Sequence, residues 1–274
     1  MRRDFRKDLA FRSSKKIVIA IKPDSPIYQE LLRKKSSHQK SLAVLIDPEE
    51  VDLAATLELI ALSEAAGVDY FFVGGSTAHY EDMDKVLGWV KAHSVIPTLI
   101  FPGNTSQLHP AADALLFLSL LSGRNADLLI GKQVESMSFL LRHEMEVIST
   151  GYLLIDGGKM TTVAYVSNTT PLPRDNHEMA LATAMAGAYL GMKLIYLEAG
   201  SGAIHSVPDA MIKKISEKLH IPLIVGGGIC TPEQAQNKLR AGADIIVIGN
   251  ILEKDPNRIT DLSIAVHHHN NITV

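Results

Sequence analysis

The sequence predicts an α/β fold, a single (β/α)₈ (TIM) barrel whose third helix is missing or very short. Eight short apolar runs alternate with helical patterns, and each run is continuously hydrophobic, as in strands buried on both faces. Hydrophobic residues make up 46% of the 274 residues but aromatic residues only 5%, so small aliphatic side chains must fill the interior. Eight such strands with helices between them favour a closed parallel barrel.

The expected strands are residues 42–46, 70–73, 97–101, 114–118, 152–155, 194–197, 223–225 and 245–248. Between the third and fourth strands, residues 102–112 include Pro102, Gly103 and Pro110, and a full helix hardly fits there. Between the fifth and sixth strands, residues 157–176 form a long polar segment. A loop of that length in a compact domain is usually a lid or a binding loop.

Helix signals lie between the strands. After the first strand, an apolar stripe at helical spacing predicts a helix that ends near Gly67, and the stripe consists of Leu53, Leu57, Ile60 and Ala61. Residues 231–234 (Thr-Pro-Glu-Gln) predict a helix start with a threonine cap, a proline in the first turn and a glutamine that closes a capping box.

The predicted barrel domain covers residues 41–265, between a basic N-terminal extension (1–40) with a leading helix and a C-terminal tail (266–274). The extension holds 12 Lys and Arg against 4 Asp and Glu. A basic arm can be attracted to anionic membranes or nucleic acids. We expect a solvated arm with no nucleic-acid partner and at most a peripheral contact with a membrane.

The cysteine content bears on the compartment. Cys230 is the only cysteine, so an internal disulfide is excluded and a reducing cytoplasm is expected. The apolar run 17–21 is too short to span a membrane. Apolar residues are scattered over the outer helix faces, and we expect a homo-oligomer.

Glycine-rich segments follow the strands, where barrel enzymes carry their active sites. Glycine lets a ligand approach the backbone closely, and successive backbone amides form an anion site. Residues 226–228 together with Gly249 and Asn250, called the glycine cup below, follow strands seven and eight, where barrels commonly bind phosphate. We also expect Gly227 to lie on a loop outside the core, where an added side chain would leave the barrel folded.

The motifs of the glycine cup contain no Lys or Arg, so a diphosphate ligand would need a metal ion. Asp47 is the obvious oxygen ligand, and Ser76, or its neighbour Thr77, could add a second oxygen at the next strand end. Mg²⁺ typically takes one or two protein ligands and completes its shell with water and phosphate oxygens. Asp47 could equally cap the following helix, because Asp-Pro is a good helix start.

These residues resemble the geranylgeranylglyceryl phosphate synthase family, in its larger group. The resemblance covers residues 40–265, and the missing third helix is also a feature of that family. Segments 45–48 and 73–77 resemble its metal-site segments, with Asp47 and Ser76 (or Thr77) as the implied ligands. The implied sn-glycerol 1-phosphate site consists of Tyr196, Leu197, Glu198, Ala199, Gly200, Ser201, Gly202, Gly227, Gly228, Gly249 and Asn250.

The resemblance implies a Mg²⁺-dependent prenyltransferase of phospholipid biosynthesis. The C3 hydroxyl of sn-glycerol 1-phosphate would attack C1 of a polyprenyl (geranylgeranyl-type) diphosphate and release diphosphate. Asp47 and Glu198 are the implied catalytic residues, and the region of residues 101–118 is a candidate wall for the prenyl chain. Glu198 either takes the hydroxyl proton or only binds glycerol hydroxyls, and the sequence leaves both roles open.

Two other functions fit the same residues. One is a different phosphate-binding barrel enzyme, a sugar-phosphate isomerase or a cyclase, with Asp47 and Asp156 as its acid and base. The other is a non-catalytic phosphate-ligand binding protein in which Glu198 only accepts hydrogen bonds. Dependence on Mg²⁺ through Asp47 separates the prenyltransferase from both.

Overall fold

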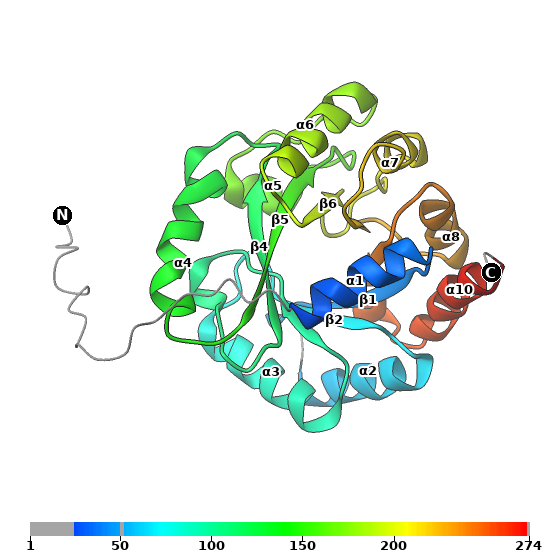
Figure 1. Cartoon of the computed structure of the whole chain (residues 1–274). Coiled ribbons are helices and arrows are strands. Elements are labelled where there is room, and N and C mark those ends of the chain that lie inside the picture. The colour runs from blue at the N-terminus through cyan, green and yellow to red at the C-terminus, as the bar shows by residue number, and fades with distance from the viewer. Residues whose placement is uncertain (1–24, 50–51, 273–274) are drawn as a thin grey trace, which may run out of the picture.

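The computed structural model describes residues 25–49 and 52–272, and the predicted (β/α)₈ barrel is confirmed (Figure 1). Eight parallel strands pair in chain order, and β1 closes the barrel by pairing with β8. The strands are β1 Ser41–Ile46, β2 Tyr70–Val73, β3 Thr98–Ile100, β4 Ala114–Leu120, β5 Glu146–Leu154, β6 Leu194–Glu198, β7 Leu223–Gly226 and β8 Ile245–Ile248.

The helices form an outer ring that is incomplete after β3. Residues 102–112 contain only a three-residue 3₁₀ turn, η1 Thr105–Gln107, so the predicted loss of the third helix is confirmed. The other helical elements are α1 Pro26–Ser36, α2 Leu53–Ala66, α3 Tyr80–His93, the π-helical turn η2 Asp127–Gly131, α4 Lys132–Leu140, α5 Thr162–Ser167, α6 His177–Tyr189, α7 Asp209–Ser216, α8 Pro232–Arg240, α9 Asn250–Lys254 and α10 Arg258–Ile272.

Three aromatic rings pack together inside the barrel, among the small aliphatic side chains of its interior. The ring centroid of Phe101 lies 5.9 Å from that of Tyr152 and 5.3 Å from that of Tyr196, and the two tyrosine rings are 5.3 Å apart. The Phe101–Tyr196 pair is stacked and the other two pairs are tilted or edge-on, and such arrangements are favourable for aromatic pairs. This cluster provides a floor for the C-terminal end of the barrel.

Helix α2 ends at Gly67 in a left-handed conformation (φ 70°), as predicted, but its buried face differs from the expected stripe. Of the four predicted residues only Ile60 is fully buried, while Leu53 is 47% exposed. The other buried residues are Thr56, Leu59 and Ser63. Small hydroxyl residues therefore face the neighbouring elements, and this helix is too apolar around its circumference for spacing to decide which face is buried.

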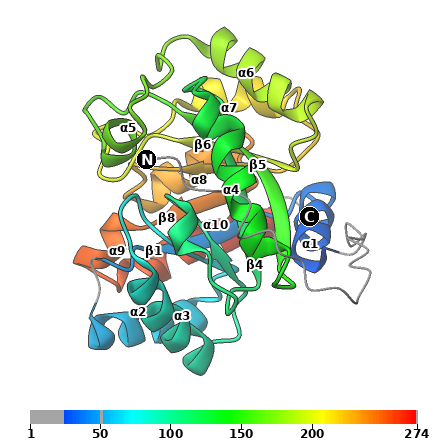
Figure 2. The ribbon, with the colours of Figure 1, turned by 90° about the vertical axis from the view of Figure 1, so that its left-hand side faces the viewer.

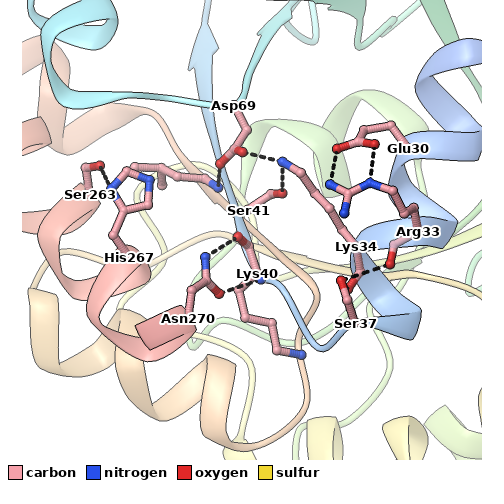
Figure 3. Close-up of polar contacts among 11 residues, drawn as sticks. Glu30, Arg33, Lys34, Ser37, Lys40, Ser41, Asp69, Ser263, His267 and Asn270 are labelled. Carbon is pink, nitrogen blue, oxygen red and sulfur yellow. Dashed lines mark hydrogen bonds and ion pairs between the residues drawn. The ribbon is translucent and has the colours of Figure 1, made fainter. Parts of the chain in front are cut away.

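The predicted tail of residues 266–274 is, as far as Ile272, the end of α10. Val266 is fully buried in the core shared by the strands and outer helices, so the domain does not end at residue 265. Asn270 then reaches back to the start of β1. Its Oδ1 accepts a hydrogen bond from Lys40 N (2.7 Å), and its Nδ2 donates to Lys40 O (3.0 Å) (Figure 3).

Helix α1 lies across the end of the barrel where the strands begin (Figures 1 and 2). Lys34 pairs with Asp69 at the start of β2 (Figure 3). Lys35 Nζ lies 2.7 Å from Asp244, and Lys40 Nζ lies 3.1 Å from the same carboxylate. The ion pairs of Lys34 and Lys35 hold α1 against the face opposite the C-terminal strand ends.

Replacing Asp244 with alanine is expected to lower the free energy of unfolding by about 3 kcal/mol, because two lysines would lose their buried partner. The Leu223 amide would also lose its acceptor, which lies 2.9 Å away. The control is Asp82→Ala, which removes a surface ion pair with Lys85 and should cost about 1 kcal/mol or less. Urea denaturation measures both changes, and equal effects would contradict a structural role for the Asp244 cluster.

Candidate active site

Two adjoining cavities lie at the C-terminal ends of the strands. The polar cavity, about 130 Å³, is lined by the strand-end residues Asp47, Ser76 and Glu198, by Glu253 of α9, and by the glycine cup apart from Gly226. The apolar cavity, about 150 Å³, is lined mainly by side chains of β4 and the flanking loops, among them Leu108, Leu115, Phe117, Leu118, Leu120 and Leu128. Both cavities are lined by Gly75, Ser76, Phe101, Tyr152 and Val163.

The glycine cup depends on backbone conformations that favour glycine. Gly227 (φ 82°) and Gly228 (φ 68°) both occupy the left-handed region. A Cβ on Gly227 would lie 2.2 Å from Glu198 Oε1 and 2.7 Å from Gly200 N. The expectation that a side chain at Gly227 would leave the fold intact is therefore wrong, because this glycine packs directly against the end of β6.

Asn250 connects the loops that follow β6 and β8. Its Oδ1 accepts hydrogen bonds from Ser201 Oγ (2.9 Å) and from Gly202 N (3.1 Å). The structure thus brings together most of the residues expected to bind glycerol phosphate. Those lining the polar cavity are Tyr196, Glu198, Gly200, Ser201, Gly202, Gly227, Gly228, Gly249 and Asn250.

Leu197 and Ala199, which were also expected among the binding residues, do not line the polar cavity. Successive strand residues point to opposite faces, so these two side chains pack in the core beneath the outer helices. The amide of Ala199 is also occupied, because it donates to Gly226 O (3.2 Å). Their inclusion in the binding site is corrected accordingly.

The Glu198 carboxyl is buried, with 6% of the residue exposed, and Oε1 accepts a 2.6 Å hydrogen bond from Gly200 N. Burial raises the pKa of Glu198 to about 7, although the Gly200 amide and the nearby Tyr196 hydroxyl act in the opposite direction. At neutral pH this carboxyl is therefore divided between its acid and base forms. A group with such a pKa suits proton transfer near pH 7.

Asp47 and Ser76 line the same cavity, at the ends of β1 and β2. A Cβ on Gly75 would lie 2.4 Å from Asp47 Oδ2, so the carboxylate rests against the Gly75 backbone. Thr77 instead donates to Glu49 Oε2 (2.6 Å) and lines neither cavity. Asp47 and Ser76 could supply the one or two protein oxygen ligands that Mg²⁺ typically takes, with water and phosphate oxygens completing its coordination shell.

Two alternatives for the aspartates lose support. Helix α2 is capped by Asp52, whose side chain accepts from Ala55 N (2.8 Å), so Asp47 is not its cap. Asp156 is exposed, accepts from Gly158 N (2.8 Å) and lines neither cavity. The acid–base pair of Asp47 and Asp156 that an isomerase would need is therefore not assembled.

Sequence reasoning missed two lysines near the cavities. Lys132, at the start of α4, lines the apolar cavity, and its Nζ lies 2.9 Å from Glu135. Lys159 follows the glycine pair 157–158 in the loop after β5, and its Nζ lies close to Gly202. The position of Lys159 directly after a glycine pair at a strand end is the sequence feature that could have indicated a site residue.

A closed barrel with a glycine cup, a buried carboxyl and an adjoining apolar cavity defines the class of phosphate-binding barrel enzymes. Within that class, this chain belongs to the PcrB family, which matches residues 34–266. Relatives named geranylgeranylglyceryl phosphate synthase, described next, confirm the resemblance drawn from the motifs.

Named relatives agree with this membership. A geranylgeranylglyceryl phosphate synthase of Chitinophaga pinensis is 47% identical over 241 residues, which are 88% of this chain and 96% of that protein. A protein of the same name from Thermococcus kodakarensis is 43% identical over 224 residues, 81% of this chain and 88% of its own length.

Among solved structures, the barrel is similar to (S)-3-O-geranylgeranylglyceryl phosphate synthase from Thermoplasma acidophilum in complex with its substrate sn-glycerol-1-phosphate. The TM-score is 0.83 at 35% sequence identity, covering 88% of this chain and 98% of that one.

Proposed function

We propose that this chain is a prenyltransferase of ether-lipid biosynthesis. It joins the C3 hydroxyl of sn-glycerol 1-phosphate to C1 of a polyprenyl diphosphate and releases diphosphate. The observation that carries the proposal is the pair of adjoining cavities, one polar with a glycine cup and one apolar. The names of the relatives and the glycerol phosphate bound in the Thermoplasma acidophilum enzyme support the same activity.

The polar cavity fits sn-glycerol 1-phosphate. The glycine cup leaves room for a phosphate beside backbone amides, which are suitable donors to an anion. The Glu198 carboxyl lies against Gly227 and can accept hydrogen bonds from the glycerol hydroxyls. These two anchors orient the substrate with its phosphate at the cup and its hydroxyls toward Glu198.

The apolar cavity fits the prenyl chain. The leucines that line it come from β4, from the segment that replaces the third helix and, for Leu128, from η2. Because no full helix covers the barrel there, apolar side chains of the strand remain available to a hydrocarbon. C1 of the prenyl diphosphate would meet the glycerol hydroxyl near the residues shared by the two cavities.

Asp47 and Ser76 would hold Mg²⁺ beside the diphosphate, where the ion, when bound, neutralises charge on the leaving group. The C3 oxygen then forms a bond to C1 as the bond from C1 to the diphosphate oxygen breaks. Glu198 takes the proton released from the C3 hydroxyl. Its pKa of about 7 makes it a suitable base near neutral pH.

Incubation with sn-glycerol 1-phosphate, Mg²⁺ and a ladder of polyprenyl diphosphates, followed by mass analysis, tests the proposal. The expected product is a prenyl ether of glycerol phosphate, formed together with diphosphate. Turnover without Mg²⁺, or no ether with any chain length, would contradict it.

Location and assembly are part of the proposal. In the described part of the chain, no helix is long and apolar enough to span a membrane. We propose a cytoplasmic enzyme, which the single cysteine supports, that contacts membranes only peripherally. The exposed Tyr189 and Leu190 at the end of α6 support a homo-oligomer.

Asn250→Asp is expected to raise the KM for sn-glycerol 1-phosphate about tenfold or more, because it places a negative charge beside the phosphate. A carboxylate can still accept the hydrogen bonds from Ser201 and Gly202, so the loops should stay in place. The control, Asn237→Asp, makes the same change on α8 outside both cavities. Steady-state kinetics with both substrates measure the effect, and an unchanged KM would place the phosphate elsewhere.

A further inference from the structure

The polar cavity is lined by several acidic side chains, although it is proposed to bind phosphorylated substrates. Asp47, Glu198 and Glu253 line it, and its lining includes no lysine or arginine. A phosphate monoester carries close to two negative charges at neutral pH. Amide dipoles donate hydrogen bonds to such a group but do not neutralise it, so a cation near the glycine cup would strengthen binding considerably.

The loop after β5 is held firmly against the loop after β6. The amides of Ile204 and His205 both donate to Gly157 O, each at 3.0 Å. A Cβ on Gly157 would lie 2.5 Å from Ala199 O, so only glycine permits this close approach. Asp156 Oδ1 adds a turn by accepting from Gly158 N (2.8 Å). The next residue, Lys159, is thus presented at a defined place beside the cavity.

The ammonium group of Lys159 lies at the rim of the polar cavity. A Cβ on Gly202 would be 3.2 Å from Lys159 Nζ, and Gly202 lines the cavity and donates to Asn250. Within residues 25–49 and 52–272, no carboxylate forms an ion pair with Lys159. A four-carbon side chain at this position can reach an anion bound at the cup.

We propose that Lys159 contacts the phosphate of sn-glycerol 1-phosphate and is a determinant of specificity for that substrate. The inference rests on the proposed function and adds to it the cation that the cup lacks. Since Lys159 approaches from the loop after β5, it binds the side of the phosphate that the amides of the cup leave open. Glycerol without a phosphate would gain nothing from it.

Lys159→Met keeps much of the side-chain length and removes the charge. We expect the KM and the calorimetric Kd for sn-glycerol 1-phosphate to rise about tenfold, the order of one charge-assisted hydrogen bond at a partly exposed site. The turnover number and the KM for prenyl diphosphate should change less than twofold. Lys159→Arg should restore most of the affinity. Lys218→Met changes an exposed lysine just beyond the end of α7 and outside the cavities, and it should behave as wild type.

Ionic strength provides a second measurement. Because a charge contact near the surface is screened by salt, added salt should weaken glycerol phosphate binding more in the wild type than in Lys159→Met. An unchanged Kd in Lys159→Met, or a loss that Lys159→Arg does not restore, would overturn the role of Lys159. If the wild type binds glycerol phosphate but makes no ether, the proposed reaction fails while the titrations still decide the role of Lys159.

Discussion

Replacing Asp47 with alanine is expected to lower turnover by about 10³-fold or more, since the leaving diphosphate would lose the ligand of its metal ion. Binding of sn-glycerol 1-phosphate should stay within about twofold, because the glycine cup and Glu198 come from other strands. Turnover is measured with saturating substrates across a Mg²⁺ titration, and glycerol phosphate binding by calorimetry.

Two variants separate charge from shape at this position. Asp47→Asn keeps an oxygen that can accept from Glu49 N (3.2 Å) but removes the charge, and it should be nearly as inactive as the alanine variant. Glu49→Gln neutralises the adjacent carboxylate, which lies outside both cavities, and should retain activity. Full turnover by Asp47→Ala, or by the wild type in excess chelator, would contradict the metal role.

Replacing Glu198 with glutamine is expected to lower kcat about 10²-fold or more while changing the KM for glycerol phosphate little, if the carboxyl accepts the hydroxyl proton. Glutamine can still accept the hydrogen bond from Gly200 N, so the local structure should persist. A deficit that lies wholly in the KM for glycerol phosphate would instead assign Glu198 a binding role alone.

The pH dependence gives the same residue an independent test. The base form of Glu198 is lost as the pH falls through its pKa of about 7. Wild-type kcat/KM should therefore decrease tenfold per pH unit well below pH 7 and level off above it. In Glu198→Gln this acidic limb should disappear, whereas an unchanged limb would mean that another group titrates.

The barrel could be predicted because its signals are local. Strands buried on both faces are continuously apolar, and each of the eight runs overlaps a strand of the structure. The capping box at Thr231 and Gln234 and the glycine end of α2 are also short-range patterns, and both are present. The helix missing after β3 followed from two prolines within eleven residues.

Features that depend on distant partners could not be predicted. Strand β5 begins at Glu146, six residues before the expected start, in a segment that carries polar residues. Glu146 binds the amides of Ile27 (3.0 Å) and Tyr28 (2.9 Å), and so it caps a helix almost 120 positions earlier. No periodicity within either segment contains that information.

Some features of the candidate site could likewise be predicted from the sequence, and others could not. We could infer which strand ends lie together, because parallel strands in a barrel end on one face. That Gly227 does not tolerate a side chain could not be inferred, because this depends on the Glu198 carboxyl, which packs against Gly227 from the neighbouring strand. The position of Lys159 likewise depends on how tightly two loops associate.

The contact between Asn270 and Lys40 has a consequence for how the chain folds. It joins residues 230 positions apart, next to the β1–β8 pairing that closes the barrel. Until β8 has been synthesised, one edge of β1 has no partner strand, so the barrel cannot close before most of the chain has left the ribosome. Contacts between residues so far apart in the sequence form slowly. In that interval the open edge of β1 is the segment most exposed to pairing with a wrong strand.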